Sequence, residues 1–558
     1  MFVRLHRQRH GGREYTSVHL CESYRDPEKG GKPRSRVVYN LGPLDKLGMD
    51  AVRKLASGFR KIAGGQATDG TVVSFPGGHD FGHVYALDRT WKNLGFSEAL
   101  LEAGIAGDAE YPVTELVRLM VINRICDPCS KLALLDWMED VHVPGFAEKK
   151  PSYHHFLRAM DRLIAVKEKA EPLVVKRLLD SSGSSSVDLV FYDITSTYFE
   201  GDRSIEEDDI RAYGYSRDGR FDRRQITIGV VMTGDGIPLC HHVFPGNTVD
   251  KTTVVEVVRD LKERFDLRNV IFVGDRGMLS DETREAVLGE ELGFIVAHPL
   301  RRNAQAAEVI GGLGNKFDRN SQKEQFLSDD RTTLRFVLAY SPAIAKEARG
   351  TREERLLCAD AFLRQILHRL VNPPARGRRM TPQGAYDRIR DYLRDRRLLS
   401  LYDVSIDDGE VRVLPNQKTR AWEEKIDGML LVETTDLTSS PEEVIRRYKE
   451  LAEIERGFRA LKSSLKLRPL NHWTEKRIRA HVFLCILALQ MERWMRKKLI
   501  DISVPKAIRI LRRIKAVMVS SPDKATLVVT MAKKEQKEIL RRLGIPSPSE
   551  LFPEFCSV

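Results

Sequence analysis

The chain has 558 residues, of which 42% are hydrophobic and 30% are charged. One hydrophobic core rarely organises so many residues, so we expect two to four domains, and the composition is that of a globular protein. No apolar run reaches the ~18 residues of a membrane-spanning helix, and the first residues lack the apolar centre of a secretory signal. These features exclude an integral membrane protein and predict a cytoplasmic location without a membrane partner.

The seven cysteines are scattered along the chain. An odd and sparse set does not predict a framework of disulfide bonds. Cys126 and Cys129 form one CxxC pair, but the sequence has no second pair to complete the four ligands of a structural zinc site. We therefore expect two half-buried thiols on a helix here rather than a metal centre.

Positive charge is concentrated in two parts of the chain, whose formal net charge is +12. Residues 456–515 contain 17 lysines and arginines against 3 acidic residues, and residues 1–40 contain 9 against 4. Such clusters favour a polyanionic partner, because each neutralised phosphate releases condensed counterions. Composition alone also fits a surface that binds anionic lipid or keeps copies of the protein apart.

The N-terminal part of the chain is predicted to contain two regions. Residues 1–80 contain short alternating segments, a helical piece at 44–62 and a glycine-rich linker, which together indicate a small α+β region. Residues 81–180 have a helical period, and this helical unit is either a DNA-binding domain or a plain structural bundle. The serine-rich segment 181–186 is expected to be a flexible joint.

From residue 187 the pattern changes to three strands followed by helix, strand, helix and strand. This order predicts an α/β fold with a ribonuclease-H-like catalytic core, in which strands connected by helices pair in parallel. We expect residues 187–300 to form its first part and 301–425 to form an insertion domain, with helical stretches at 352–370 and 385–398, before the last catalytic helix. Residues 426–515 should form its second part, which includes a helix at 475–498. Residues 516–558 are expected to be a C-terminal tail.

Two of these predicted strands deliver an aspartate at their C-terminal end. Because side chains alternate along a strand, Asp193 ends the buried row that starts at Val187, and Asp275 ends a similar row in the strand that starts at Val270. Open α/β sheets build their sites at this edge. A single aspartate usually only ends a strand, but the matched pair favours a functional site.

A carboxylate also interrupts the apolar stripe of a long helix predicted from Pro441 to Leu465. Glu455 falls on one stripe with Leu451 and Phe458 at three- and four-residue steps. Burying an unpaired carboxylate costs free energy, so Glu455 should meet a metal ion or a cation. An ion pair with Arg459, four residues further on, is the structural alternative.

Several segments together resemble the bacterial insertion-sequence DDE transposases of the cut-and-paste type. The spacing of Tyr448, Leu451, Glu455 and Lys462 is similar to the Tyr-Arg-Glu-Lys signature of that family. The segments YDITSTYFEG and VGDRGM resemble its two catalytic-aspartate motifs, and the resemblance covers roughly residues 187–500. One position departs from the signature, because Leu451 stands where the family has arginine.

The resemblance implies that Asp193, Asp275 and Glu455 are the catalytic residues and the metal ligands. Mg²⁺ is the implied cofactor, with Mn²⁺ as a substitute, since both prefer oxygen ligands. Two such ions ~3.5–4 Å apart activate the attacking oxygen and stabilise the leaving oxygen of a phosphodiester. The implied nucleophiles are water and a DNA hydroxyl, so no covalent protein–DNA intermediate is expected.

The resemblance also implies a set of DNA contacts. Tyr448 is expected to bind a phosphate, and Lys462, about two helical turns from Glu455, to reach the backbone of the bound DNA end. The insertion of this family is largely β-structured, and a flipped base is held there against aromatic rings. Trp422 is the candidate for such stacking, with a role in the core as its alternative. The expected DNA-binding residues are Tyr448, Arg456, Arg459, Lys462, Arg276 and Trp422.

These features predict a transposase that cleaves DNA at the ends of an element and transfers the strands into target DNA. The expected partners are double-stranded DNA, as terminal inverted repeats and as target, and a second copy of the chain, since synapsis joins two ends. Two alternatives stay open: a ribonuclease-H-like nuclease without strand transfer, and a catalytically silent DNA-binding protein derived from a transposase. The presence of all three acidic residues argues against the silent protein.

Overall fold

The computed structural model describes the chain in ranges separated by short gaps. The described residues are 2–10, 13–26, 32–43, 78–105, 111–146, 150–183, 189–200, 209–216, 219–248, 250–265, 271–274, 281–289, 292–301, 303–373, 379–520 and 525–548. Contacts within the chain divide it into two compact units. The first unit comprises Met1–Val187, Ile194–Thr248 and Glu453–Val558, and the second comprises Asp188–Asp193 and Val249–Ala452. No helix in the described ranges has both the length and the apolar content needed to cross a lipid bilayer.

The first unit begins with a three-stranded antiparallel sheet. Its strands follow one another in sequence and in space, and Phe2 pairs with Cys21 at the start of the first ladder. The alternating segments predicted near the N-terminus are therefore confirmed as strands. The predicted helix at 44–62 and the glycine-rich linker lie outside the described residues. The strands are β1 (Phe2–His10), β2 (Arg13–Asp26) and β3 (Lys32–Pro43).

A group of packed helices follows in the first unit and confirms the helical period of this region. α4 and α16 are buried along most of their length, because both are apolar on nearly all sides. α6 packs against both of them. The cationic Arg118 on α4 is buried in an ion pair with Asp88. The helices are α2 (Gly82–Asn93), α3 (Phe96–Glu102), α4 (Val113–Cys126), α5 (Ala133–Asp140), α6 (Tyr153–Ala165), α7 (Lys167–Ser182) and α16 (Glu475–Lys498).

The last part of the first unit is folded, so the expected C-terminal tail is wrong for its described residues. β15 pairs with β16 and also with β4, a short strand far away in the sequence. The side chain of Gln536 on α18 donates to the carbonyl of Ile510 over 3.0 Å. These contacts attach the segment to the helices before it. The elements are β4 (His79–Asp80), α17 (Val504–Leu511), β15 (Lys515–Ser520), β16 (Ala525–Val529) and α18 (Lys534–Arg542).

The central sheet has eight strands in the order β10-β11-β14-β9-β8-β5-β6-β7. β8 pairs in parallel with β5 and β9, and the other recorded ladders are antiparallel. Three strands in sequence, β5, β6 and β7, are followed by β8 and β9, which are reached through helices and pair in parallel with β5 and with each other in turn. This order confirms the predicted α/β class with a ribonuclease-H-like core. The elements are β5 (Leu189–Tyr198), β6 (Gln225–Thr233), β7 (Pro238–Pro245), α8 (Asp250–Phe265), β8 (Ile271–Gly274), α9 (Asp281–Gly289), β9 (Gly293–Ala297), β10 (Gln325–Asp330), β11 (Arg335–Tyr340) and β14 (Met429–Thr434).

The expected insertion at 301–425 differs from the prediction in two respects. Its strands β10 and β11 extend the central sheet, and the rest is mainly helical rather than β-structured. The cause is the composition of residues 342–371, which are rich in alanine, leucine, glutamate and arginine and form one 30-residue helix. The elements are α10 (Ala304–Leu313), α11 (Pro342–Val371), α12 (Pro382–Asp395), β12 (Tyr402–Asp407), β13 (Glu410–Pro415) and α13 (Gln417–Ile426).

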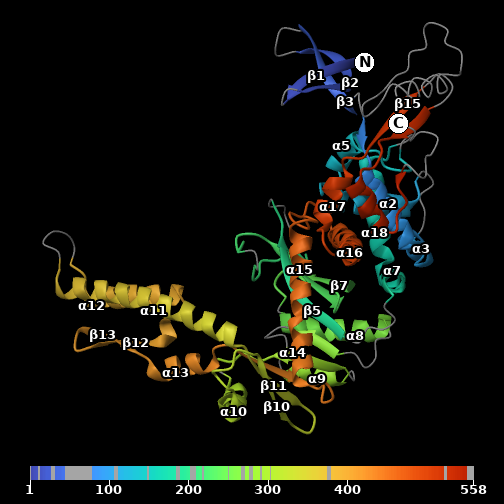
Figure 1. Ribbon diagram of the computed structural model, residues 1–558. Coiled ribbons are helices and arrows are strands. Elements are labelled where there is room, and N and C mark those ends of the chain that lie inside the picture. Colours follow the sequence, from blue (N-terminus) through green and yellow to red (C-terminus); the bar gives the residue numbers. More distant parts are fainter. Residues whose placement is uncertain are drawn as a thin grey trace, which may run out of the picture. The chain divides into compact units, whose positions relative to one another are not determined.

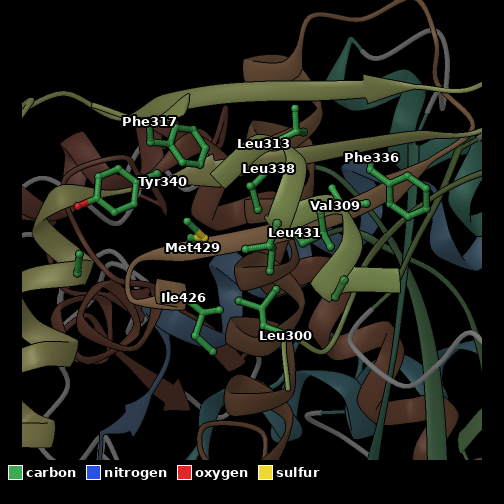
Figure 2. Packing of buried hydrophobic residues seen from close by; sticks show 13 residues of the cluster. Leu300, Val309, Leu313, Phe317, Phe336, Leu338, Tyr340, Ile426, Met429 and Leu431 are labelled. Carbon is green, nitrogen blue, oxygen red and sulfur yellow. The ribbon is translucent and has the colours of Figure 1, made fainter. Parts of the chain in front are cut away.

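Two hydrophobic clusters hold the insertion together. Figure 1 shows α11 and α12 lying side by side next to the β12–β13 hairpin, and this arm has its own core around Leu363, Ile389 and Leu401. The second cluster attaches the arm to the sheet. Figure 2 shows its side chains from α10, β11, α13 and β14, among them Phe336 and Leu431.

Candidate functional site

Asp193 lies within β5, in the second unit, and its side chain is half-buried between the buried Tyr192 and Ile194. The sequence predicted that the strand ends at this residue, which is wrong, because β5 continues to Tyr198. The β-branched and hydroxylated residues after Asp193 favour the extended backbone, and their side chains are buried. A hydrogen bond of 2.7 Å from the Tyr192 hydroxyl to Thr253 on α8 fixes the strand directly before Asp193.

The second predicted aspartate follows the neighbouring strand. In the parallel ladder of β5 and β8, Phe191 lies opposite Val273. Asp193 and Asp275 each come two residues after this pair in the sequence. Asp275 and Arg276 lie outside the described residues, so their roles stay predictions.

Glu455 lies on α15 (Leu451–Lys462), in the first unit. The single helix predicted over 441–465 is divided at residue 450, and the preceding part is α14 (Pro441–Lys449). Glu455 is exposed, so its placement on the buried stripe is wrong. The buried residues of α15 are Ile454, Gly457, Phe458 and Leu461. Glu455 is not buried, so the free-energy cost of burying an unpaired carboxylate gives no reason to expect a metal ion or a cation beside it.

The ion pair between Glu455 and Arg459 that we considered is not formed, although both residues lie in described parts of α15. The carboxylate that binds cations is that of Glu453, two residues earlier. It pairs with Arg456 on the same helix, and its Oε2 lies 3.6 Å from the Arg493 guanidinium on α16. Burial lowers the pKa of Arg493 from its usual range. Glu453 therefore holds α15 against α16, whereas Glu455 points to solvent.

The remaining predicted DNA contacts occupy different parts of the molecule. Tyr448 on α14 and Lys462 at the end of α15 are half-buried, and Arg459 is exposed. Trp422 on α13 packs against the cluster of Figure 2, and its indole nitrogen donates to the carbonyl of Leu300 over 3.1 Å. These contacts give Trp422 a structural role in the second unit, and its stacking on a base stays a prediction.

An exposed cluster of aromatic and arginine side chains, which was not predicted from the sequence, follows β5 in the first unit. We call it the aromatic loop, and it comprises residues 211–216 and 219–224. Tyr213, Tyr215 and Phe221 are 52%, 77% and 63% exposed. The guanidinium of Arg224 lies 4.8 Å from the ring centre of Tyr213. The segment RAYGYSRDGRFDRR carried a usable signal, since aromatic residues alternate with arginines as in nucleic-acid interfaces.

The first half of the aromatic loop is fixed by hydrogen bonds to the sheet. The Gln225 side chain donates to the carbonyls of Tyr215, over 3.0 Å, and Gly246, over 2.9 Å. The backbone of Ala212 also pairs with that of Gln225. The exposed rings are therefore presented from an ordered backbone.

Replacing Gly214 by alanine is expected to destabilise this loop. A Cβ atom there would lie less than 3.0 Å from the backbone oxygen and carbon of Gly246, which cannot move independently of the sheet. Overpacking of this kind costs about 1–3 kcal/mol, measured as a lower free energy of unfolding in urea. Gly312→Ala on α10 is the control, because no atom lies within 4 Å of its added Cβ. An unchanged unfolding curve for Gly214→Ala would contradict the close approach to Gly246.

Comparison with known families decides the identity. The model described as "Transposase DDE domain" matches residues 188–491, which is more than half of the chain. The chain belongs to the DDE transposase family. A second model, described as "IS1634 family transposase, N-terminal domain", matches residues 3–69. The match at 188–491 contains the three predicted acidic residues, and DDE transposases are enzymes that cleave and transfer DNA strands with divalent metal ions.

Two solved transposase structures are similar to this one at low sequence identity. The first is the piggyBac transposase synaptic complex with hairpin DNA, with 9% identity, a TM-score of 0.36 and coverage of 77% of this chain and 78% of that chain. The second is the Mos1 transposase paired-end complex with the left transposon end, with 15% identity, a TM-score of 0.15 and coverage of 34% and 59%. No curated protein sequence matches the chain. The match of the DDE-domain model over residues 188–491 confirms the family, and the Tyr-Arg-Glu-Lys subgroup stays a prediction.

Proposed function

We propose that this DDE transposase uses Asp193, Asp275 and Glu455 to cleave the ends of its own element and to join the freed 3′-hydroxyls to target DNA. The observation that carries the proposal is the parallel register of β5 and β8, with Phe191 opposite Val273. Continuing that register by two residues would bring Asp193 and Asp275 to adjacent positions on one face of the sheet. Glu455 would complete the site from α15.

The donor set fits magnesium or manganese. All three side chains offer carboxylate oxygens, which these ions prefer, and none offers sulfur or imidazole nitrogen. Glu455 is exposed and makes no ion pair with Arg459, so it would bind an ion without first breaking that contact. When bound, two such ions supply an activated oxygen nucleophile and neutralise charge at the phosphate. We propose Mg²⁺ as the ion used in the cell.

The cationic residues beside Glu455 would orient the DNA backbone. Arg459 is exposed on the same helix, and Lys462 follows two turns after Glu455. Arg456 is the weaker candidate, because its guanidinium already pairs with Glu453. Tyr448, Arg276 and Trp422 remain further candidates for contacts with phosphate or base.

Strand cleavage and joining distinguish this proposal from the alternative enzyme. Purified protein is incubated with Mg²⁺, a duplex that carries the inverted repeats flanking its gene, and a supercoiled target plasmid. Both nicked ends and joined products are expected. Nicked ends without joined products would support a nuclease, and binding without nicks would support a silent DNA-binding protein.

We further propose that the aromatic loop binds unpaired DNA. Stacking of a base on an exposed ring contributes ~1–3 kcal/mol, so Tyr215→Ala is expected to weaken binding of single-stranded DNA by roughly ten-fold. Fluorescence anisotropy with a labelled oligonucleotide measures this effect. Leu101→Ala on α3, which also removes an exposed apolar side chain, is the control. Equal affinities of both variants and the wild type would contradict a role of Tyr215 in binding.

Two broader statements follow from the proposed reaction. Joining two ends in one complex requires two active sites, so we propose a homodimer in the synaptic complex. The substrate is chromosomal DNA of a bacterial cell, so we propose that the protein acts in the cytoplasm at the nucleoid. Analytical ultracentrifugation of the protein with and without end DNA tests the dimer.

A further inference from the structure

A cavity of about 140 Å³ lies within the first unit. Its walls come from the loop between α4 and α5, the start of α6, the segment between α15 and α16, and α16 itself. This volume exceeds what a single water molecule needs. The lining residues are Arg124, Pro128, Cys129, Ser130, Lys131, Leu132, Tyr153, Lys466, Arg468, Pro469, Asn471, His472 and His481.

The charged side chains that line the cavity are those of lysines and arginines. Four lysines and arginines contribute to the wall, and no aspartate or glutamate does. Two of the cations, Arg124 and Lys131, are each only 3% exposed. Buried cations are normally paired with an anion, because desolvation of an unpaired charge costs several kcal/mol. This cavity lacks the carboxylate that would balance them.

Two buried donors at the cavity have no partner among the described residues. They are Nζ of Lys131 and Nε of Arg124. Arg124 uses its other nitrogens to donate to the carbonyls of Cys129, over 3.2 Å, and Lys466, over 3.4 Å. Burial and the neighbouring Arg124 lower the pKa of Lys131 to about 7. An anion that entered the cavity would favour the charged ammonium form of Lys131.

The other polar groups of the cavity do not favour a metal ion. Burial raises the pKa of the Cys129 thiol, so the thiolate form that binds metals is disfavoured. A metal would have to displace the thiol proton beside two cations, Arg124 and Lys131, that repel it. Among the described residues, no three ligand atoms of cysteine, histidine or acidic side chains come together at this cavity. An anion is the ligand that this lining fits.

We propose that this cavity binds a phosphate group of a DNA strand. Lys131 and Arg124 would donate charge-assisted hydrogen bonds to the phosphate oxygens, which are stronger than neutral ones. The entrance is accessible, since Lys466 and Asn471 are exposed and Leu132 is 63% exposed. The identification of DNA as the source of the phosphate rests on the proposed function.

The cavity is lined by the segment that connects α15 to α16. The segment that carries Lys466, Arg468 and Asn471 directly follows α15, the helix that bears Glu455. A phosphate held there would fix this segment between α15 and α16. DNA binding would thereby order the chain next to the helix of a predicted catalytic residue.

Lys131→Met tests the cavity with inorganic phosphate as the probe. The substitution keeps the length of the side chain and removes an unpaired buried charge, so the protein is expected to fold. Phosphate, compared with chloride at equal ionic strength, is expected to raise the Tm of the wild type by at least about 2 °C and to leave the Tm of the variant unchanged. Lys176→Met on α7, an exposed lysine, should respond as the wild type does.

A second measurement identifies DNA as the source of the phosphate. Binding of an end duplex is followed without divalent ions at several salt concentrations. Lys131→Met is expected to weaken binding roughly ten-fold and to reduce the slope of log K against log salt by about 1, as for one lost phosphate contact. Lys176→Met should keep the affinity and the slope of the wild type.

The outcomes separate this proposal from that of the catalytic site. Loss of the phosphate effect together with weaker DNA binding and a salt slope reduced by about 1 in Lys131→Met supports a DNA phosphate in the cavity. Loss of the phosphate effect with unchanged DNA binding overturns the assignment to DNA, and an unchanged response to both probes overturns the cavity as an anion site. Neither readout requires cleavage, so failure of the carboxylates as catalytic residues would leave both results unaffected.

Discussion

Replacing Asp193 by asparagine is expected to reduce magnesium-dependent cleavage of element ends by about three orders of magnitude. The amide keeps the size of the side chain but loses the negative charge that would bind the ions. Metal ions contribute several kcal/mol to stabilising the transition state, and roughly 1.4 kcal/mol corresponds to a factor of ten in rate. The measurement is the initial rate of nicking of a labelled duplex with the inverted repeat.

The control for this variant is Asp180→Asn, which changes an exposed carboxylate at the end of α7. Its nicking rate should equal that of the wild type. Asp193→Asn should bind the end duplex with nearly wild-type affinity in the absence of metal, which shows that the fold persists. Nicking by Asp193→Asn at the wild-type rate would rule out this residue as a metal ligand.

Glu453 and Glu455 provide a matched pair on one helix. Glu455→Gln is expected to lower the nicking rate as strongly as Asp193→Asn while leaving the free energy of unfolding unchanged, because the carboxylate is exposed. Glu453→Gln is expected to do the opposite. Its carboxylate lies close to Arg456 and Arg493, the second of which is buried, and weakening such a contact costs stability.

Both effects are measured on the same samples, by urea unfolding and by the rate of nicking. Glu453→Gln should shift the unfolding midpoint downward and keep most of its activity at low temperature. If Glu453→Gln lost cleavage without losing stability, and Glu455→Gln stayed active, the catalytic glutamate would be Glu453. The two residues are two positions apart, so this result would move the site by slightly more than half a helical turn.

Much of the fold could be predicted from the sequence, because its strands and helices have clear periods. The helix from Glu475 to Lys498 and the strands β5 to β9 and β14 were predicted within a few residues, whereas β10 and β11 were not predicted. The prediction was less accurate where the helical period alone had to indicate which way a single side chain points. Glu455 lies next to the buried Ile454, and adjacent residues on a helix differ by about 100° in direction. The division of the helix at residue 450 added to this error.

The expected tail and the expected β-structured insertion were wrong for a different reason. β15 is stabilised by pairing with β4, which lies in a distant, N-terminal part of the sequence, and no local pattern records such a partner. The β-structure was implied by the family resemblance, whereas the pattern of the residues themselves predicted the helical stretches at 352–370 and 385–398, which are confirmed. The helical propensity of residues 342–371 indicates the helix that these residues form.

The cavity could not be predicted from the sequence at all. Arg124 and Lys131 are far from Lys466 and His472 along the chain, and only the packing of α4 against α16 brings them together. The positive charge near the C-terminus is visible in the sequence and favours a polyanionic partner. Two cations from another segment that lack a counter-ion are not visible there.

Crystals of the protein grown with Mn²⁺ and an end duplex test the central claim most directly, since anomalous scattering locates each manganese ion. We predict at least one ion bonded to carboxylate oxygens of Asp193 and Asp275, with Glu455 bonded to the same ion or to its neighbour. Manganese bound elsewhere, with these three carboxyl groups far apart, would contradict the account.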